Sequence, residues 1–124
     1  MNWREYFNDN NGDGYLATAD VGGEVNIAPY FRPEVLGDGS LAFGMSNGRT
    51  YRNVKQNGHA TFAFNEGAHR GVRLYLEKTE EVDKGLVLEK LRARADAEVL
   101  PGTGRHLEHV VVFRVTRHEP LTNV

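Results

Sequence analysis

Three polar side chains near the middle of the chain have the types and the spacing that a phosphate group needs. The stretch GMSNGRTYRNVKQNGHATFAF, residues 44–64, places Arg49, Thr50 and Asn53 around the start of a short helix expected at 50–57. Asn53 lies four residues after Arg49 and three after Thr50, so on a helix these side chains are neighbours. A guanidinium, a hydroxyl and a carboxamide beside the N-terminus of a helix favour a phosphate monoester. The alternative is a capped surface helix with solvated arginines.

The strands expected on either side of this cluster, at 24–31 and 41–46, each have a bulky face and a face of small or polar side chains. The bulky side chains are Val25, Ile27, Leu41, Phe43 and Met45, and the small or polar ones are Asn26, Ala28, Ala42, Gly44 and Ser46. Small side chains let a flat ligand lie close to a strand backbone. The same pattern is also typical of a solvent face, or of a face packed tightly on a helix.

The stretch DNNGDGYLATAD, residues 9–20, resembles the calcium-binding loop of an EF-hand, with Asp9 at the first position and Asp20 at the twelfth. The twelfth position usually supplies a bidentate Glu. An EF-hand also needs an outgoing helix, whereas Gly22, Gly23 and later prolines follow Asp20. We therefore interpret the stretch as a polar turn that leads into a strand.

Two further groups of residues have weaker chemical interpretations. His106 and His109 are three apart, a spacing that binds metal on a helix, but Pro101 and the nearby glycines make a helix doubtful there, and we expect no metal site. The segment PGTGRH, 101–106, has the glycines of a phosphate-binding loop, yet two glycines after a helix usually only end it.

The elements that must position these residues are mainly strands. Period-two alternation and Gly-rich turns predict strands at 15–20, 24–31, 41–46, 59–66, 71–81 and 109–117. Helical spacing predicts a helix from about 81 to 99, and shorter helices are expected at 2–8 and 50–57. Short strands joined by hairpin turns predict a mainly β chain with helices, built as a small antiparallel barrel.

Composition excludes several classes of function. The 124 residues have the length of a single domain, and the net charge of -2 argues against nucleic-acid binding. The absence of cysteine excludes disulfides and thiolate chemistry. The N-terminal stretch is polar and charged, unlike a secretory signal, and no apolar run has the length of a membrane span. We expect a soluble cytoplasmic protein without membrane partners.

Four stretches in register resemble the FMN-binding split-barrel family related to pyridoxamine 5′-phosphate oxidase. They are GYLATAD, VNIAPYFRPEV, GDGSLAFGMS and RTYRNVKQNGHATFAF, and they cover residues 12–65. The strand at 71–80 fits as the next barrel strand, and 82–118 match in outline. The resemblance implies one domain over 1–124 with a six-stranded split barrel that forms a homodimer, with FMN at the dimer interface.

The resemblance also implies which residues hold the cofactor. The phosphate-binding residues would be Arg49, Thr50 and Asn53, with Arg52 adjacent. The isoalloxazine ring would lie along two strands and be held partly by their backbone, at Asn26, Ile27, Ala28, Phe43, Gly44, Met45 and Ser46. Trp3 and the 101–109 loop are candidates for residues that a second subunit adds to the site.

The expected function is that of a flavin-dependent oxidoreductase with a small-molecule redox partner or nicotinamide donor, and no catalytic residue can be named. A flavin carrier or sensor without turnover is the alternative. Relatives that bind a deazaflavin or haem in this fold keep those ligands open. The chain is shorter than the oxidase and lacks its C-terminal substrate-binding segment, which makes pyridoxamine phosphate a poor candidate substrate.

Overall fold

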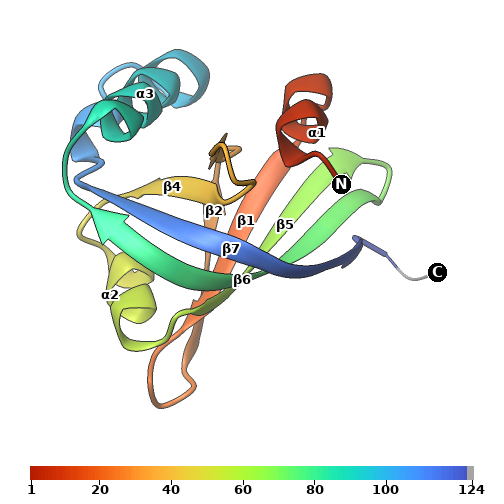
Figure 1. Ribbon diagram of the computed structural model, residues 1–124, viewed down its shortest axis with the longest axis horizontal. Coiled ribbons are helices and arrows are strands. Elements are labelled where there is room, and N and C mark those ends of the chain that lie inside the picture. Colours follow the sequence, from red (N-terminus) through yellow and green to blue (C-terminus); the bar gives the residue numbers. More distant parts are fainter. Residues whose placement is uncertain (123–124) are drawn as a thin grey trace.

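A computed structural model describes residues 1–122, over which seven strands form one strongly curled antiparallel sheet (Figure 1). The strands are β1 (Asp13–Ala19), β2 (Val25–Tyr30), β3 (Glu34–Val35), β4 (Leu41–Met45), β5 (His59–Gly67), β6 (Arg70–Val82) and β7 (His109–Pro120). Their order across the sheet is β2-β1-β5-β6-β7-β4-β3. The predicted fold class is therefore confirmed, but the strand count of six is wrong by one. The additional strand is β3, whose two residues are too few to show a period of two.

Three α-helices lie at the rims of the curled sheet: α1 (Trp3–Asp9), α2 (Arg49–Gln56) and α3 (Leu86–Arg94). A π-helical turn, η1 (Ala95–Val99), extends α3, and a short 3-10 turn, η2 (Gly104–His106), precedes β7. None of the helices in residues 1–122 combines the length and apolar character needed to cross a bilayer.

The third helix begins later than the sequence predicts. The expected start near residue 81 is wrong because β6 continues to Val82, where it pairs with Val110 of β7. Gly85, with a φ of 113°, then caps α3 at Leu86. The charged residues at 80–84 fit a helical pattern locally, but the backbone of β7 offers them hydrogen-bond partners far along the chain, and this pairing decides the structure.

The stretch that resembles a calcium loop leads into a strand, as predicted. Strand β1 occupies Asp13–Ala19 within the stretch and forms a hairpin with β2, in which Leu16 lies opposite Ala28. At the hairpin turn, the side-chain oxygen Oδ1 of Asp20 accepts hydrogen bonds of 2.9 Å from the backbone N–H groups of both Gly22 and Glu24. Asp20 therefore closes a turn, and a strand stands where an EF-hand has its outgoing helix.

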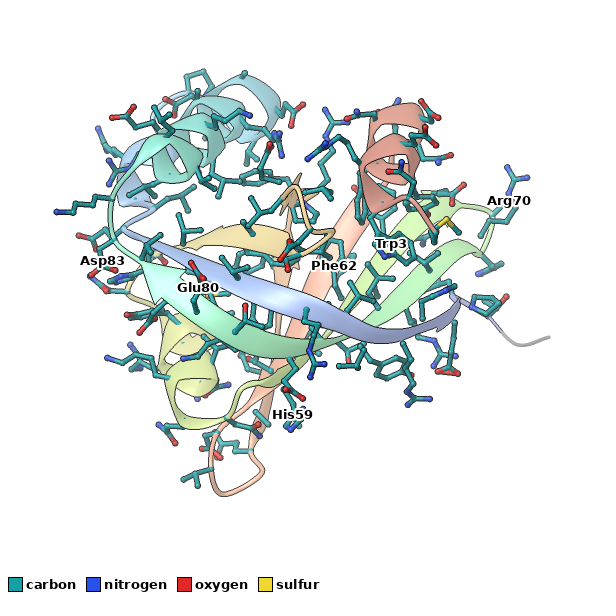
Figure 2. The ribbon with its side chains drawn as sticks, in the orientation of Figure 1. Trp3, His59, Phe62, Arg70, Glu80 and Asp83 are labelled. Carbon is teal, nitrogen blue, oxygen red and sulfur yellow. The ribbon has the colours of Figure 1, made fainter. Side chains whose placement is uncertain are left out.

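The inner face of the sheet holds an aromatic core. Phe43, Phe62, Phe64 and Phe113 are at most 1% exposed, and Figure 2 shows Phe62 inside the curl. Each such ring contributes about 1.5–3 kcal/mol by leaving water. Trp3 of α1 packs into this core at 7% exposure. The interpretation of Trp3 as a residue that reaches a partner's site is therefore not supported by its burial.

A second core cluster lies on the other side of β4, beneath α3. Ala42 packs there with Leu88, Leu91 and Leu107. A Cβ at Gly44 would come within 2.8 Å of the side chain of Leu107. The sequence left open whether the small residues of β4 face a ligand, solvent or a closely packed helix. For Ala42, the structure shows close packing on a helix.

Candidate cofactor site

A cleft of about 830 Å³ lies beside the start of α2, between the hairpin β1–β2 and the segment 98–107. Its volume falls within the range of cofactor sites, which is about 300–1,000 Å³. Seven of the residues predicted from the sequence line it: Asn26, Ile27, Ala28, Gly44, Ser46, Arg49 and Thr50. The structure thus gathers residues from β2, β4 and α2 around one space.

The α2 end of the cleft is suited to an anion. Gly48 caps the helix without a side-chain hydrogen bond, so no side chain occupies the first N–H groups of α2. Arg49 follows at once, and its side chain is 58% exposed. Its ion pair with Glu24 is 3.3 Å long and exposed on both sides, which makes it worth at most about 1 kcal/mol. The Arg49 guanidinium is therefore available to a ligand.

Thr50 and Tyr30 form the wall next to Arg49. Both line the cleft, and Thr50 is 7% exposed. Burial raises the pKa of Tyr30 to about 12, against the opposite and smaller effect of its hydrogen bond with Thr50. Tyr30 thus presents a neutral hydroxyl at physiological pH. The sequence interpretation missed Tyr30, although its place at the end of the predicted strand was a usable signal.

The other two residues of the predicted phosphate cluster point elsewhere. Asn53 is 6% exposed, and its Nδ2 donates a 3.1 Å hydrogen bond to Oγ1 of Thr18 in β1. Arg52 is exposed and donates to the backbone oxygen of Asn47 at 3.3 Å. Neither residue lines the cleft. Asn53 fastens α2 to the sheet, so Arg49 and Thr50 remain as the side chains at the anion end.

Strand β4 and Ser46, which follows it, divide their side chains between the cleft and the core. Phe43 and Met45 are at most 1% exposed and belong to the aromatic core, whereas Gly44 and Ser46 line the cleft. The alternation of side chains along a strand explains this division. The predicted contacts at Phe43 and Met45 can therefore involve only their backbone groups.

A cluster around His109 holds the loop in front of α2. The ring of His109 stacks on Tyr51, with centroids 3.7 Å apart and planes 5° from parallel. Its Nδ1 lies 2.7 Å from Oδ1 of Asp83, and its Nε2 lies 2.6 Å from Oδ1 of Asn47. The amide of Asn47 in turn donates to Glu108. These contacts tie the 46–48 loop to the ends of β6 and β7.

The histidine pair named in the sequence does not converge. His106 lines the cleft, while both ring nitrogens of His109 have protein partners outside it. No group of three or more His, Asp or Glu side chains within residues 1–122 is arranged to hold a metal ion.

The segment after α3 supplies the far wall of the cleft. Glu98, Val99, Thr103, His106 and Leu107 line it. The 101–109 loop was considered as a contribution from a second subunit, and here it borders the cleft of its own chain. The phosphate-loop interpretation of 101–106 fails, because Oδ1 of Asp96 accepts the N–H groups of Gly102 and Gly104 at 3.1 and 2.8 Å.

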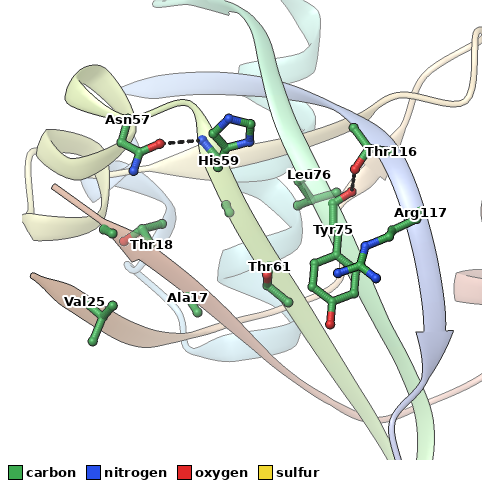
Figure 3. A pocket seen from close by; sticks show the side chains of 12 residues that line it. Ala17, Thr18, Val25, Asn57, His59, Thr61, Tyr75, Leu76, Thr116 and Arg117 are labelled. Carbon is green, nitrogen blue, oxygen red and sulfur yellow. Dashed lines mark hydrogen bonds between the residues drawn. The ribbon is translucent and has the colours of Figure 1, made fainter. Parts of the chain in front are cut away.

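The outer face of the sheet carries a shallower hollow of about 430 Å³ (Figure 3). Thr61, Tyr75 and Arg117 line it, and the Arg117 guanidinium stacks over the Tyr75 ring at 3.9 Å. Val25 borders this hollow at 78% exposure, and its neighbour Ile27 is 67% exposed and borders the cleft. Val25 and Ile27 of β2 thus face outward, between the hollow and the cleft.

The fold and the cleft define a split-barrel protein with a cofactor-sized site beside α2. No family model and no curated protein matches the sequence. Among solved structures, an FMN-binding protein from Syntrophomonas wolfei subsp. wolfei matches with a TM-score of 0.79 and 25% identity, over 99% of this chain and 86% of that one. An F420 reductase matches with a TM-score of 0.71 and 21% identity, over 93% of this chain and 94% of that one.

A pyridoxamine 5′-phosphate oxidase-like protein from Lactobacillus delbrueckii matches with a TM-score of 0.68 and 20% identity, over 96% of this chain and 92% of that one. These structural neighbours are consistent with the FMN-binding split-barrel family related to pyridoxamine 5′-phosphate oxidase, and the chain shares their fold. The named neighbours represent more than one chemistry, so the ligand and the activity have to be argued from the site.

Proposed function

We propose that this protein is a single split-barrel domain that binds FMN in the cleft beside α2 and acts as a flavin-dependent oxidoreductase. The observation that carries the proposal is the convergence of Arg49, Thr50 and the N-terminus of α2 at one end of an 830 Å³ cleft. One full positive charge, a hydroxyl and free backbone N–H groups suit the phosphate monoester of FMN.

The rest of the cleft suits a flat ring system. Tyr15, Tyr30, Phe31 and Leu107 give it an apolar and aromatic lining, and the backbone of residues 26–28 runs along one side. Bound FMN would supply the redox chemistry. The chain would hold the phosphate, exclude water with the side chains of the 98–107 segment, and offer the neutral Tyr30 hydroxyl as a hydrogen-bond donor.

The proposed assembly is a homodimer with the cofactor at the interface. Val25, Ile27 and Tyr15 expose 78%, 67% and 43% of their surface on the outer side of β1 and β2. Tyr15 and Ile27 also border the cleft. A second copy packed on this face would cover these apolar side chains and close the open side of the cofactor site.

The first experiment is the visible absorption spectrum of freshly purified protein, followed by identification of the chromophore that denaturation releases. A yellow protein that releases FMN supports the proposal. A colourless protein that takes up no added FMN contradicts it. Equilibrium sedimentation of the same preparation tests the dimer.

Two other proposals stay open at the same site. The likeness to an F420 reductase favours a deazaflavin as the alternative ligand, and haem is the other ligand that the family resemblance implies. The released chromophore distinguishes all three. A flavin carrier or sensor is the alternative to an enzyme, and a holoprotein whose flavin is not reduced by NADH or NADPH would favour it.

A further inference from the structure

A second pocket, of about 320 Å³, lies between α1, the short strand β3 and α3, and is lined by basic side chains. Arg4 comes from α1, Arg32 from the connection before β3, and Lys90 and Arg94 from α3. Glu34 of β3 is the carboxylate among the lining residues. Four cations from three separate elements therefore face one small space.

Two carboxylates balance part of this charge. Glu34 accepts from Arg94 at 2.6 Å and from Lys90 at 3.1 Å, and Glu98 pairs with Arg32 at 2.5 Å. Burial raises the pKa of Glu34, but its hydrogen bonds with Lys90 and Arg94 outweigh this effect and lower it overall. Glu34 is therefore ionised at neutral pH and balances one of the positive charges.

Arg4 has no carboxylate partner within the chain from residue 1 to 122. Its Nη2 donates a 2.7 Å hydrogen bond to the backbone oxygen of Val35, which orients the guanidinium without neutralising it. Four cations against Glu34 and Glu98 leave a local surplus of two positive charges, in a chain whose net charge is -2.

The basic pocket and the cofactor cleft share a boundary. Glu98 lines the cleft, as does Phe31, and Glu98 is also the partner of Arg32, which lines the pocket. The Arg32–Glu98 ion pair thus joins a residue of the pocket to a residue of the cleft. A molecule with an anionic end in the pocket would therefore lie next to residues that border the cleft.

We propose that the pocket formed by Arg4, Arg32, Lys90 and Arg94 binds the phosphate groups of a small phosphorylated molecule, and that this molecule is the redox partner of the cleft. The second half of the proposal rests on the proposed flavin function, and the first half does not. A diphosphate matches the surplus of positive charge, and a dinucleotide would place a diphosphate in the pocket and extend a ring past Arg32–Glu98.

Calorimetric titration of the FMN-free protein with inorganic pyrophosphate tests the first half. Saturable binding with one site per chain is expected. Lys90→Gln and Arg4→Gln should each weaken it about tenfold, because each removes one charged donor. Lys90 is 63% exposed, so its replacement leaves the fold intact. Arg114→Gln is the matched control, since it removes one charge at an exposed pair with Glu77 on a distant strand.

The control separates a built pocket from general electrostatics. Unchanged affinity in Arg114→Gln supports the pocket. The absence of saturable binding, or an equal loss in all three variants, overturns it. ADP in place of pyrophosphate identifies the source of the phosphate: binding at least as tight supports a nucleotide, and the exclusion of ADP overturns the dinucleotide.

Anaerobic mixing of the FMN-loaded protein with NADPH tests the second half. Reduction of the bound flavin bleaches its absorbance and needs no further oxidant. The concentration of NADPH at half-maximal rate should rise about tenfold in Lys90→Gln and Arg4→Gln, while the limiting rate stays the same. Unaltered half-saturation in both variants, or no bleaching at all, overturns the link to the redox partner. Neither result changes the conclusion drawn from pyrophosphate binding to the FMN-free protein.

Discussion

Helix α2 presents two polar residues one turn apart that have opposite surroundings. Arg49 stands at the open end of the helix, 58% exposed, beside a cleft. Asn53 lies on the side that packs against β1, where it is 6% exposed and bonded to Thr18. Spacing alone groups the two residues together as ligands of one phosphate. The difference shows that an eight-residue helix needs an anchor as much as a binding end.

Charge and burial distinguish the two roles. A buried carboxamide with a protein partner stabilises the fold, since leaving either group unpaired costs about 1–3 kcal/mol. A guanidinium whose protein partner is an exposed carboxylate is available to bind a ligand, because such a pair contributes little to folding. The four predictions below test this division between an anchoring side and a binding end.

The largest expected effect is on cofactor binding. Arg49→Ala should raise the dissociation constant of FMN about 10- to 100-fold, since one charged hydrogen-bond donor to the phosphate is lost. The midpoint of urea unfolding of the FMN-free protein should stay the same. Fluorescence titration of FMN measures the constant, and Arg114→Ala serves as a control for the loss of one positive charge. Equal FMN affinity in wild type and Arg49→Ala would place the phosphate elsewhere.

Asn53→Ala should produce the opposite pattern. The free energy of unfolding should fall by about 1–3 kcal/mol, because the Thr18 hydroxyl loses its buried partner. Urea denaturation measures the fall, and a cycle with Thr18→Ala should show a coupling of at least about 0.5 kcal/mol. FMN affinity should change less than in Arg49→Ala. A loss of affinity equal to that in Arg49→Ala, with stability unaltered, would return Asn53 to the phosphate site.

The free energy of unfolding should depend on alkaline pH through Tyr30, which lines the cleft. An unfolded tyrosine ionises near pH 10, whereas Tyr30 keeps its proton until about pH 12. The stability that its neutral form provides is therefore complete below pH 10 and is lost as the pH rises toward 12. The free energy of unfolding should decline over this interval, less steeply in Tyr30→Phe. An identical slope in both proteins would contradict the burial of this hydroxyl.

The smallest effect is expected at the loop in front of α2. His109→Gln removes the stacking on Tyr51, which lines the cleft, and weakens the hold on Asn47, whereas His109 itself does not line the cleft. FMN affinity should fall about threefold, less than in Arg49→Ala, because the effect passes through the position of the loop. The same fluorescence titration measures it. A loss as large as that in Arg49→Ala would mean that His109 contacts the ligand directly.

Most of the fold could be predicted from the sequence because its strands alternate clearly. The alternation in 71–81 and the phenylalanines of 59–66 each predicted a strand that the structure contains. The short strand β3 and the extension of β6 to Val82 could not be predicted in this way. Both depend on pairing with strands distant in the sequence, β4 and β7, and a local pattern carries no record of such partners.

The candidate site also contains residues that local sequence patterns predict and residues whose position depends on distant parts of the chain. Arg49 and Thr50 were accessible to sequence reasoning because helix-end chemistry is local. The contribution of Glu98 and His106 was not, since it depends on how the chain returns after α3. The direction of Asn53 also depends on a strand more than thirty residues earlier, where Thr18 accepts its hydrogen bond.

Both edge strands of the sheet are poorly suited to pairing with a further strand. Strand β2 lies at one edge and contains Pro29, which has no backbone N–H to donate, and β3 at the other edge has two residues. A long row of free backbone groups along which further chains could add their own strands is therefore missing from this sheet, and growth of fibres by edge-to-edge addition is disfavoured. Self-association at high concentration is therefore expected to use the faces of the sheet rather than its edges.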